Sequence, residues 1–493
     1  MTTCKPTRRE FLFRAAAMAA IGALGRPVRG AAPAGPVSAA SASAGAAPGA
    51  ESGASAAGSA SAGPPAGRRP NIVFILADDL GYGDIGCYGC RDIRTPAIDG
   101  LAAEGVRFSQ YYAAGAECTP TRTALLTGRY FHRVGGLECA IGTGNVGRYD
   151  DAVRLAAQHD LGLPAEETSI ARLIKDAGYR TAVCGKWHLG YEPKFLPSRH
   201  GFDRFIGILG GNADYFHHCE TDGTKVLYEN DRPVERPEYL TDLITDESVA
   251  FIRAAAGAPF FLYVAYTAPH SPYQGPKDRS PAPVPKEKAE AGTRAKLIEM
   301  IEAMDAGVGK ILRALDEKGL AAGTLVFFVS DNGGTGPGTN TPLSGGKGTT
   351  REGGIRVPCI ARWPGVLPRG RAVETPAITM DLSVSLVAAA GARWPAGRTP
   401  DGIDILAYVR DGTAPPARPL FFRNRRGENT WRAVRDGSMK HLSRQSGEKT
   451  EQWLYDLAAD AAEKNDLAAA RPDEVKRLKA LLAAWEKEVQ PRR

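Results

Sequence analysis

The chain has 493 residues, enough for two or three domains, and its 24% charged and 43% hydrophobic residues are typical of a soluble globular protein. Its formal net charge is +7, but residues 1–69 hold eight basic and two acidic residues, so the other 424 residues carry only +1. The part of the chain that is able to fold is therefore not strongly basic, which argues against a nucleic-acid-binding protein.

The first segment has the features of an export signal. Residues 7–12 read TRREFL, and an alanine-rich apolar stretch follows over residues 13–24. Paired arginines before a short apolar segment are typical of a twin-arginine signal, and the stretch is too short to stay in a bilayer as a spanning helix. We therefore predict a twin-arginine export signal over residues 1–32. It implies the twin-arginine export machinery as a partner, a periplasmic or extracellular location, and no stable membrane insertion.

Residues 33–69 consist almost entirely of Ala, Gly, Ser and Pro. Such a composition buries too little apolar surface to fold, so we expect a disordered linker. Beyond it, the pattern of elements predicts a large α/β domain over residues 70–415 and a small C-terminal α+β domain over residues 416–493.

Apolar, β-branched runs in the large domain predict strands that are buried on both faces of a sheet. These runs lie at residues 71–77, 181–184, 260–266 and 324–329. Helices are predicted between them, at residues 166–177 with Thr168 near the N-terminal cap, and at about residues 293–318. The alternation of strands and helices predicts a large, mainly parallel sheet flanked by helices.

Polar residues follow each of these four strands at its carboxyl end. They are Asp78, Asp79, Lys186, His188, His270, Asp331 and Asn332. In open α/β sheets, ligands bind at this edge. The shared placement therefore predicts one site that is built by four strands far apart in the sequence.

The C-terminal segment has a different pattern. Short apolar runs at residues 420–422, 431–435 and 452–455 are joined by turn residues and predict an antiparallel sheet. Residues 472–489 are strongly amphipathic and predict a terminal helix.

Residues 118–122 read CTPTR and form the sharpest motif in the sequence. Pro120 suits the first turn of a helix. Cys118 would then lie at the helix N-terminus, where free N–H groups favour negative charge, and Arg122 would follow one turn later on the same face. This spacing predicts a reactive group and a fixed cation around one anion. A plain buried cysteine at a helix start is the alternative.

Together with residues 126–129, which read LTGR, this motif resembles the formylglycine-dependent sulfatases, arylsulfatase-like enzymes of the alkaline-phosphatase superfamily. The resemblance spans about residues 70–470. It implies a sulfuric ester hydrolase that acts on an aryl or carbohydrate sulfate. It also implies that a formylglycine-generating enzyme oxidises Cys118 to formylglycine. One hydroxyl of the hydrated aldehyde would attack sulfur, and the other would allow sulfate to be expelled.

Four oxygen donors favour a hard cation over zinc, because no matching cluster of His and Cys accompanies them. The resemblance assigns these donors to Ca²⁺, with the modified Cys118 facing the ion: they are Asp78, Asp79, Asp331 and Asn332. An all-protein cage fits Ca²⁺ better than Mg²⁺, which stays an alternative. For the aspartate pair alone, helix capping or a solvated turn would fit equally well.

The resemblance also assigns catalytic roles to Arg122, Lys186, His188, His270 and Lys347. The three cations would neutralise the anionic ester. His270 would donate a proton to the leaving alcohol, and His188 would take one from the second hydroxyl of the nucleophile. Lys186, His270 and Lys347 would also contact the substrate. Taken singly, each of them fits a surface lysine or a satisfied core histidine better.

Residues 212–218 read NADYFHH and resemble stretches of bacterial arylsulfatase-like enzymes and galactosamine-sulfate sulfatases. Tyr215 and His218 are therefore candidates for substrate binding, although core packing fits them as well. The same polar cluster would stabilise a phosphate or phosphonate ester, so a phosphoester or phosphonate ester hydrolase is one alternative. A non-catalytic glycan-binding protein is another, but it predicts losses among the metal and catalytic positions, and the sequence has none.

Overall fold

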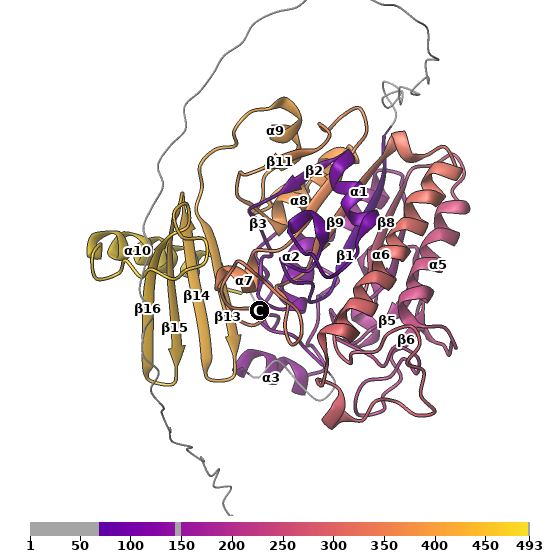
Figure 1. The fold of residues 1–493 in the computed structure, drawn as a ribbon, viewed down its shortest axis with the longest axis horizontal. Helices are drawn as coiled ribbons and strands as arrows, with labels where there is room; N and C mark the ends of the chain where they lie inside the picture. The colour runs from indigo at the N-terminus through magenta and orange to yellow at the C-terminus, as the bar shows by residue number, and fades with distance from the viewer. Residues whose placement is uncertain (1–68, 143–148, 492–493) are drawn as a thin grey trace, which may run out of the picture. The chain divides into compact units, whose positions relative to one another are not determined.

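A ten-stranded sheet forms the centre of the fold (Figure 1). The computed structural model describes residues 69–142 and 149–491. The predicted export signal of residues 1–32 and all but the last residue of the predicted linker lie outside the described residues. In the part of the chain that is described, no helix is long and apolar enough to cross a membrane.

The strands of this sheet run in the order β11-β2-β10-β9-β1-β8-β4-β5-β6-β7. Their bounds are β1 Asn71–Ala77, β2 Val106–Phe108, β4 Arg180–Gly185, β5 Arg204–Ile208, β6 Leu227–Glu229, β7 Arg232–Pro233, β8 Phe260–Ala265, β9 Thr324–Ser330, β10 Cys359–Arg362 and β11 Arg371–Val373. The five central strands, β9-β1-β8-β4-β5, are all parallel, which confirms the predicted core of the sheet. Antiparallel pairs join β10 to both of its neighbours and β6 to both of its neighbours, so the complete sheet is mixed. A separate two-stranded sheet pairs β3 Tyr111–Tyr112 with β12 Ala377–Ile378.

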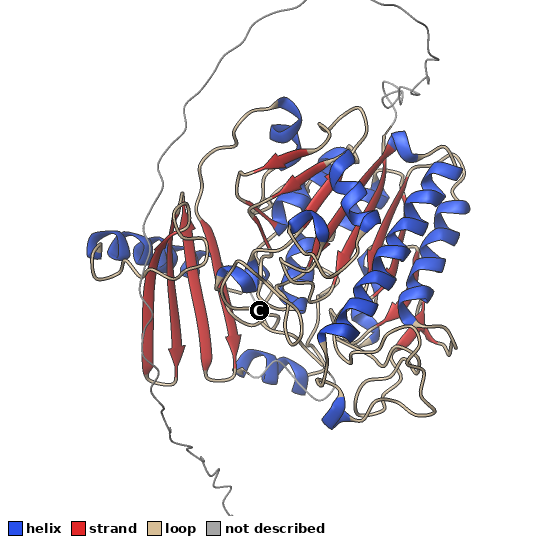
Figure 2. Ribbon diagram, in the orientation of Figure 1, coloured by secondary structure: helices blue, strands red, loops and turns tan. Residues whose placement is uncertain are grey.

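Helices cover both faces of the large sheet (Figure 2). The helices of this part of the chain are α1 Pro96–Glu104, α2 Cys118–Thr127, α3 Asp150–Ala157, α4 Ile170–Asp176, α5 Leu240–Arg253, α6 Arg294–Glu317, α7 Glu352–Ile355, α8 Thr379–Ala389 and α9 Ile405–Asp411. All of them except α3 and α7 contribute side chains to the two cores on the faces of the large sheet. Neighbouring residues of β1 point into different cores. Phe74 packs in the core beneath α2, α4 and α8, whereas Ile75 packs in the core beneath α1, α5 and α6. Because both faces of β1 are buried, its apolar run is continuous rather than alternating.

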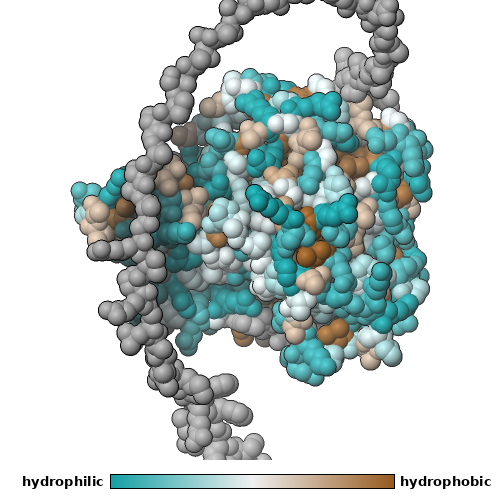
Figure 3. Space-filling model, viewed as in Figure 1, coloured by the Kyte–Doolittle hydropathy of each residue, from teal (hydrophilic) through white to brown (hydrophobic). Residues whose placement is uncertain are grey.

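The outer surface is correspondingly polar. Figure 3 shows a mostly hydrophilic face with a few small hydrophobic patches. Among the described residues, Val153 is the one large hydrophobic residue that is exposed, and its exposed fraction is 50%. The apolar side chains are therefore used almost entirely in the cores that hold the sheets and helices together.

The start of α4 differs from the predicted one. The helix begins at Ile170, and its cap is Ser169 rather than Thr168, because Ser169 Oγ accepts a hydrogen bond from the N–H of Ala171 at 3.0 Å. Only the residue directly before the first turn places its side-chain oxygen within reach of these N–H groups. The predicted helix at about residues 293–318 is confirmed as α6, which is capped by Thr293.

A second sheet follows in the C-terminal segment and is antiparallel, as predicted. Its strands, in the order β13-β14-β15-β16, are Leu420–Arg426, Asn429–Asp436, Met439–Ser446 and Lys449–Asp456. The helix α10 Pro472–Glu488 confirms the predicted terminal helix. The strand β15 was not predicted, because most of its side chains are polar. It is held by main-chain pairing to both neighbours and by three buried residues, Lys440, His441 and Leu442.

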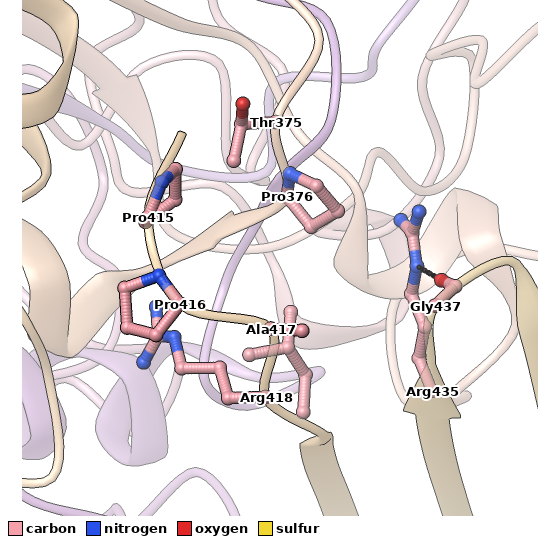
Figure 4. A pocket seen from close by; sticks show the side chains of 9 residues that line it. Thr375, Pro376, Pro415, Pro416, Ala417, Arg418, Arg435 and Gly437 are labelled. Atoms are coloured by element: carbon pink, nitrogen blue, oxygen red, sulfur yellow. Dashed lines mark hydrogen bonds between the residues drawn. The ribbon is translucent and has the colours of Figure 1, made fainter. Parts of the chain in front are cut away.

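A small cavity of about 180 Å³ lies where the chain enters this second sheet (Figure 4). Its lining includes Pro376, Pro415 and Pro416 and two arginines. Both arginines are already engaged: Arg418 pairs with Asp381, and Arg435 donates to the carbonyl of Gly437. The cavity therefore offers an apolar surface without a free charge.

A buried ionic cluster connects the two sheets. Lys440 Nζ lies 2.8 Å from Glu352 Oε1 and 2.9 Å from Glu463 Oε1, and all three side chains are inaccessible to solvent. Glu352 is the first residue of α7, and its other oxygen accepts a hydrogen bond from Tyr112 OH at 2.7 Å. Such a cluster is stable only while every charge in it has a partner.

We expect Lys440→Ala to lower the free energy of unfolding by about 3–5 kcal/mol, because it leaves two buried carboxylates without their cation. Urea denaturation monitored by circular dichroism measures this loss. Lys449→Ala is the matched control, since Lys449 pairs with Glu451 at 2.8 Å in a solvent-accessible part of the same sheet. Equal stability of the two variants would contradict the assigned role of Lys440.

Candidate active site

The polar residues predicted at the strand ends do meet in one place. The parallel strands β9, β1, β8 and β4 are direct neighbours, so the segments after them emerge at the same edge of the sheet. Contacts link all four segments: Lys186 pairs with Asp78, His270 Nε2 lies 3.5 Å from Asp79 Oδ2, and Asn332 Nδ2 donates to Asp79 Oδ1 at 2.7 Å.

The backbone is unusual at two of these positions. Asp79 has φ 62° and His188 has φ 59°, a left-handed conformation that non-glycine residues rarely adopt. Each follows a buried strand, and the turn directs its side chain into the site. Such conformations persist where the surrounding structure enforces them, which is common at functional sites.

Cys118 lies at the N-terminus of α2, as predicted, and is completely buried. Its Sγ donates to Asp78 Oδ1 at 3.2 Å. Burial raises the pKa of the Cys118 thiol well above its usual value, and the negative charges of Asp331 and Asp78 raise it further. The thiol is therefore protonated at neutral pH and is a poor nucleophile in this form.

Arg122 points from the same face of α2 into the cluster and is also buried. Its Nε and Nη2 lie 3.2 and 2.9 Å from Asp331 Oδ2, and its Nη1 donates to the carbonyl of Lys186 at 3.0 Å. Nη2 is also 3.8 Å from Asp78 Oδ2. Arg122 thus fixes the positions of the Asp331 and Asp78 carboxylates.

Three carboxylates crowd together beside Cys118. Ligand atoms of Asp78, Asp79, Cys118 and His270 all lie within 4.8 Å of one another. Burial, together with the nearby charge of Asp78, raises the pKa of Asp331 to about 6. A cation placed among these groups would relieve that repulsion.

One buried atom of a residue that contacts this cluster has no partner. Asn332 Oδ1 is buried and accepts no hydrogen bond from any described residue, although Asn332 Nδ2 is fully engaged. A buried carbonyl oxygen without a donor is costly unless something else binds it. The oxygen donors of Asp78, Asp79, Asp331 and Asn332 therefore fit a hard divalent cation.

Two lysines and one histidine complete the cluster. Lys186 pairs with Asp78, and Lys347 Nζ donates to Asp79 Oδ2 at 2.8 Å and lies 3.0 Å from His270 Nε2. Burial alone would lower the pKa of Lys347, but Asp79 raises it well above the usual value. Burial and the charge of Lys347 lower the pKa of His270 to about 4. His270 is therefore neutral at pH 7, with Nδ1–H donating to the Ser271 carbonyl at 2.7 Å and Nε2 facing Lys347.

His188 is held as a neutral base. Its Nε2 donates to the carbonyl of Ile141 at 2.5 Å, and its buried Nδ1 has no hydrogen-bond partner among the described residues. Burial and the nearby charge of Lys186 lower the pKa of His188 well below its usual value. The side chain therefore offers a free lone pair at Nδ1, as a proton acceptor requires.

The two candidates for substrate binding, Tyr215 and His218, lie in the interior. Tyr215 is fully buried, stacks on Tyr239 with 5.4 Å between ring centroids, and donates its hydroxyl to the carbonyl of His270 at 2.9 Å. His218 is also buried. Tyr215 thus supports the backbone that carries His270.

Two further residues, which the sequence does not predict, support the start of α2 and the loop that carries Lys347. Glu117 directly precedes α2 without capping it through its side chain, and its carboxylate accepts hydrogen bonds from the N–H of Ala140 at 2.9 Å and from Asn424 Nδ2 at 3.3 Å. Asn424 Nδ2 also donates to the carbonyl of Gly348 at 3.1 Å. One side chain of the second sheet therefore braces both the start of α2 and the loop that carries Lys347. No local pattern in the sequence signals this contact, because 307 residues separate its two ends.

The comparisons with known proteins agree with this geometry. A protein-family model described as Sulfatase matches residues 70–392. The chain is 34% identical over 433 residues to the steryl-sulfatase of Mus musculus, covering 70% of this chain and 66% of that protein. It is 37% identical over 407 residues to the N-acetylgalactosamine-6-sulfatase of Rattus norvegicus, covering 78% and 72%. Among solved structures, Ps i-CgsB in complex with k-i-k-neocarrahexaose has a TM-score of 0.74 and 31% identity, covering 86% of this chain and 94% of that one.

We expect a divalent cation to raise the melting temperature of protein that has been stripped with a chelator. At a concentration 100 times its Kd, the cation would stabilise the fold by about 2.7 kcal/mol. Asn332→Ala removes one of the four oxygen donors and should reduce this gain, whereas Asn465→Ala on the exposed surface should keep it. Differential scanning fluorimetry with Ca²⁺, Mg²⁺ and Zn²⁺ measures the shift. An equal gain in Asn332→Ala and in the control would place the ion elsewhere.

Proposed function

Because this chain belongs to the sulfatase family, we propose that it hydrolyses a sulfate ester at the Cys118 site and releases inorganic sulfate. The observation that carries this proposal is the cluster itself. A buried residue at a helix N-terminus faces three carboxylates, two lysines and an arginine, all at the carboxyl edge of a parallel sheet. This arrangement suits a dianionic transition state held beside a cation.

The nucleophile is proposed to be formylglycine, made by oxidation of Cys118 by a formylglycine-generating enzyme. Once hydrated, its aldehyde supplies one hydroxyl to attack sulfur and a second hydroxyl through which the sulfate is later expelled. The high pKa of the unmodified thiol supports this proposal, since the thiol would not ionise at neutral pH. Cys118 and all of α2 are buried, so the modifying enzyme is expected to act before the chain folds.

The cation is proposed to be Ca²⁺, held by Asp78, Asp79, Asp331 and Asn332. When bound, it would polarise the sulfate oxygens and offset the charge of the carboxylates. The four protein oxygens favour Ca²⁺ over Mg²⁺, which usually keeps several water ligands. The unpartnered Asn332 Oδ1 supports a ligand at this position.

The remaining residues are proposed to bind the ester and move protons. Lys186 and Lys347 would contact the sulfate oxygens, while Arg122 keeps Asp331 in place. His188 Nδ1 has a free lone pair and would take a proton from the second hydroxyl of the nucleophile. The pair of His270 and Lys347, 3.0 Å apart, would supply the proton for the leaving alcohol.

The substrate is proposed to be a sulfated carbohydrate or an aryl sulfate. The similarity to an N-acetylgalactosamine-6-sulfatase and to a structure in complex with a neocarrahexaose supports the carbohydrate. We also propose export through the twin-arginine signal of residues 1–32. Because that route carries folded proteins, formylglycine would have to be installed in the cytoplasm before export.

Peptide mass spectrometry across residues 108–122 tests the nucleophile. We expect natively produced, active protein to carry an aldehyde in place of the Cys118 thiol. Cys118→Ala should lower kcat by at least about 10³-fold, as for the loss of other covalent nucleophiles, while the protein stays folded. Cys359→Ala is the matched control, since Cys359 is equally buried but lies in β10. Active protein with only unmodified Cys118 would rule out the proposed chemistry.

Sulfate and phosphate esters of one chromogenic alcohol separate the sulfatase from a phosphoesterase or phosphonate ester hydrolase with the same site. We expect kcat/KM to be at least about 10-fold higher for the sulfate, a difference of about 1.4 kcal/mol in transition-state binding. Inorganic sulfate release and phosphate release are measured side by side. A higher kcat/KM for the phosphate would favour the alternative, and turnover of neither would favour a glycan-binding protein.

A further inference from the structure

The two faces of the sheet β13–β16 have different surroundings. On one face lies α10, where Phe421 stacks on Trp485 at 5.2 Å and Glu486 accepts from Arg423 and Arg432. The opposite face carries the alternate residues of each strand and turns toward the large sheet. At one end of this face, Lys440 is buried against Glu352 of α7.

Farther along the same face, toward the hairpin turns, the side chains become accessible. Asn424 holds the carbonyl of Gly348, and Trp431 lies directly opposite Asn424 on the neighbouring strand. Trp431 and Trp453 are both partly exposed, and their indole rings stack with 6.2 Å between centroids and 19° between planes. Two adjacent indoles therefore form an open aromatic surface that begins next to the loop of Lys347.

Arginines bracket the two indoles. The guanidinium carbon of Arg444 lies 5.5 Å from the Trp431 ring centroid, and that of Arg351 lies 5.2 Å from the Trp453 centroid. Within the described ranges, no carboxylate lies within ion-pair distance of either arginine. Arg444 donates instead to Asn429 Oδ1 at 3.3 and 3.0 Å. Glu451 lies opposite Arg444 in the register of β15 and β16, but its ion pair is with Lys449 at 2.8 Å, so neither Arg351 nor Arg444 has a direct ion pair with a described residue on this aromatic surface.

A third arginine joins this surface to the catalytic cluster. Arg426 is 46% exposed, and its Nη1 lies 3.8 Å from Glu117 Oε1, beside Gly348. Arg351 follows Lys347 by four residues, at the end of the same loop. We name the set of Trp431, Trp453, Arg351, Arg426 and Arg444 the indole–arginine strip. It is continuous with the loop and the helix start that form one wall of the site.

We propose that the indole–arginine strip binds the part of a sulfated oligosaccharide that lies beyond the sugar whose ester is cleaved. Indole faces provide flat apolar surfaces for the C–H face of a sugar ring. Guanidinium groups bind sulfate or carboxylate through two parallel hydrogen bonds. Among the arginines of the strip, Arg426 alone has a carboxylate of the described chain within 4.0 Å, and the combination of stacked indoles and arginines matches a carbohydrate with several anionic groups. A neutral glycan would leave Arg351 and Arg444 without an anionic partner. This inference rests on the proposed function for the choice of substrate.

Binding to the inactive Cys118→Ala protein tests the strip without depending on turnover. The probes are sulfated hexasaccharides of chondroitin 6-sulfate and of carrageenan, with neutral N-acetylchitohexaose as the uncharged comparison, measured by isothermal titration calorimetry. We expect at least one sulfated hexasaccharide to bind more tightly than inorganic sulfate and than the neutral one. Adding Trp431→Ala or Arg444→Gln should each weaken that binding by about 10-fold, as expected for a residue at the centre of an interface.

Arg477→Gln, on the exposed side of α10, is the matched control and should leave the affinity unchanged. Turnover of 4-nitrophenyl sulfate, which is too small to reach the strip, should stay within about twofold in the Trp431 and Arg444 variants. If these variants lose both affinity for the hexasaccharide and turnover of 4-nitrophenyl sulfate, the residues support the structure, and the proposal is overturned. Unchanged hexasaccharide affinity, or equal affinity for the neutral one, would also overturn it. Specific binding without any sulfate release would keep the strip and reject the proposed hydrolysis.

Discussion

The rest of the structure depends on three buried carboxylates beside Cys118. Each has its own cation: Asp78 has Lys186, Asp79 has Lys347, and Asp331 has Arg122. Buried charges are tolerated only when they are paired, so the strand ends, α2 and the loop that carries Lys347 must all be in place at once. Lys186 and Lys347 are thereby held beside Asp78 and Asp79.

Much of this arrangement could be predicted because its signals are local. The continuous apolar run of β1 reports burial on two faces, and the carboxyl ends of parallel strands meet by geometry rather than by chance. The motif of residues 118–122 likewise encodes its own helix start. Where two neighbouring residues both suit the same role, the sequence does not separate them: Thr168 and Ser169 are both good caps, and the structure uses Ser169.

The rest could not be predicted for two different reasons. The polar strand β15 has little apolar pattern, although Gly437 and Gly447, both with positive φ, stand in two-residue turns that bound it. Glycines with positive φ in two-residue turns are the local sequence signal for the ends of such a strand. The contact of Glu117 with Asn424, in contrast, joins positions 307 residues apart and has no local trace. The indole–arginine strip depends on the register in which the strands pair, and the sequence alone does not give that register.

The contacts of Asn424 also affect the order in which the cluster can be assembled as the chain is made. A ribosome-bound chain that ends before β13 already contains every carboxylate, lysine and histidine of the cluster, but neither the start of α2 nor the loop of Lys347 has its final support. The final support of the α2 start and of the Lys347 loop therefore comes from a residue that follows every member of the cluster in the sequence.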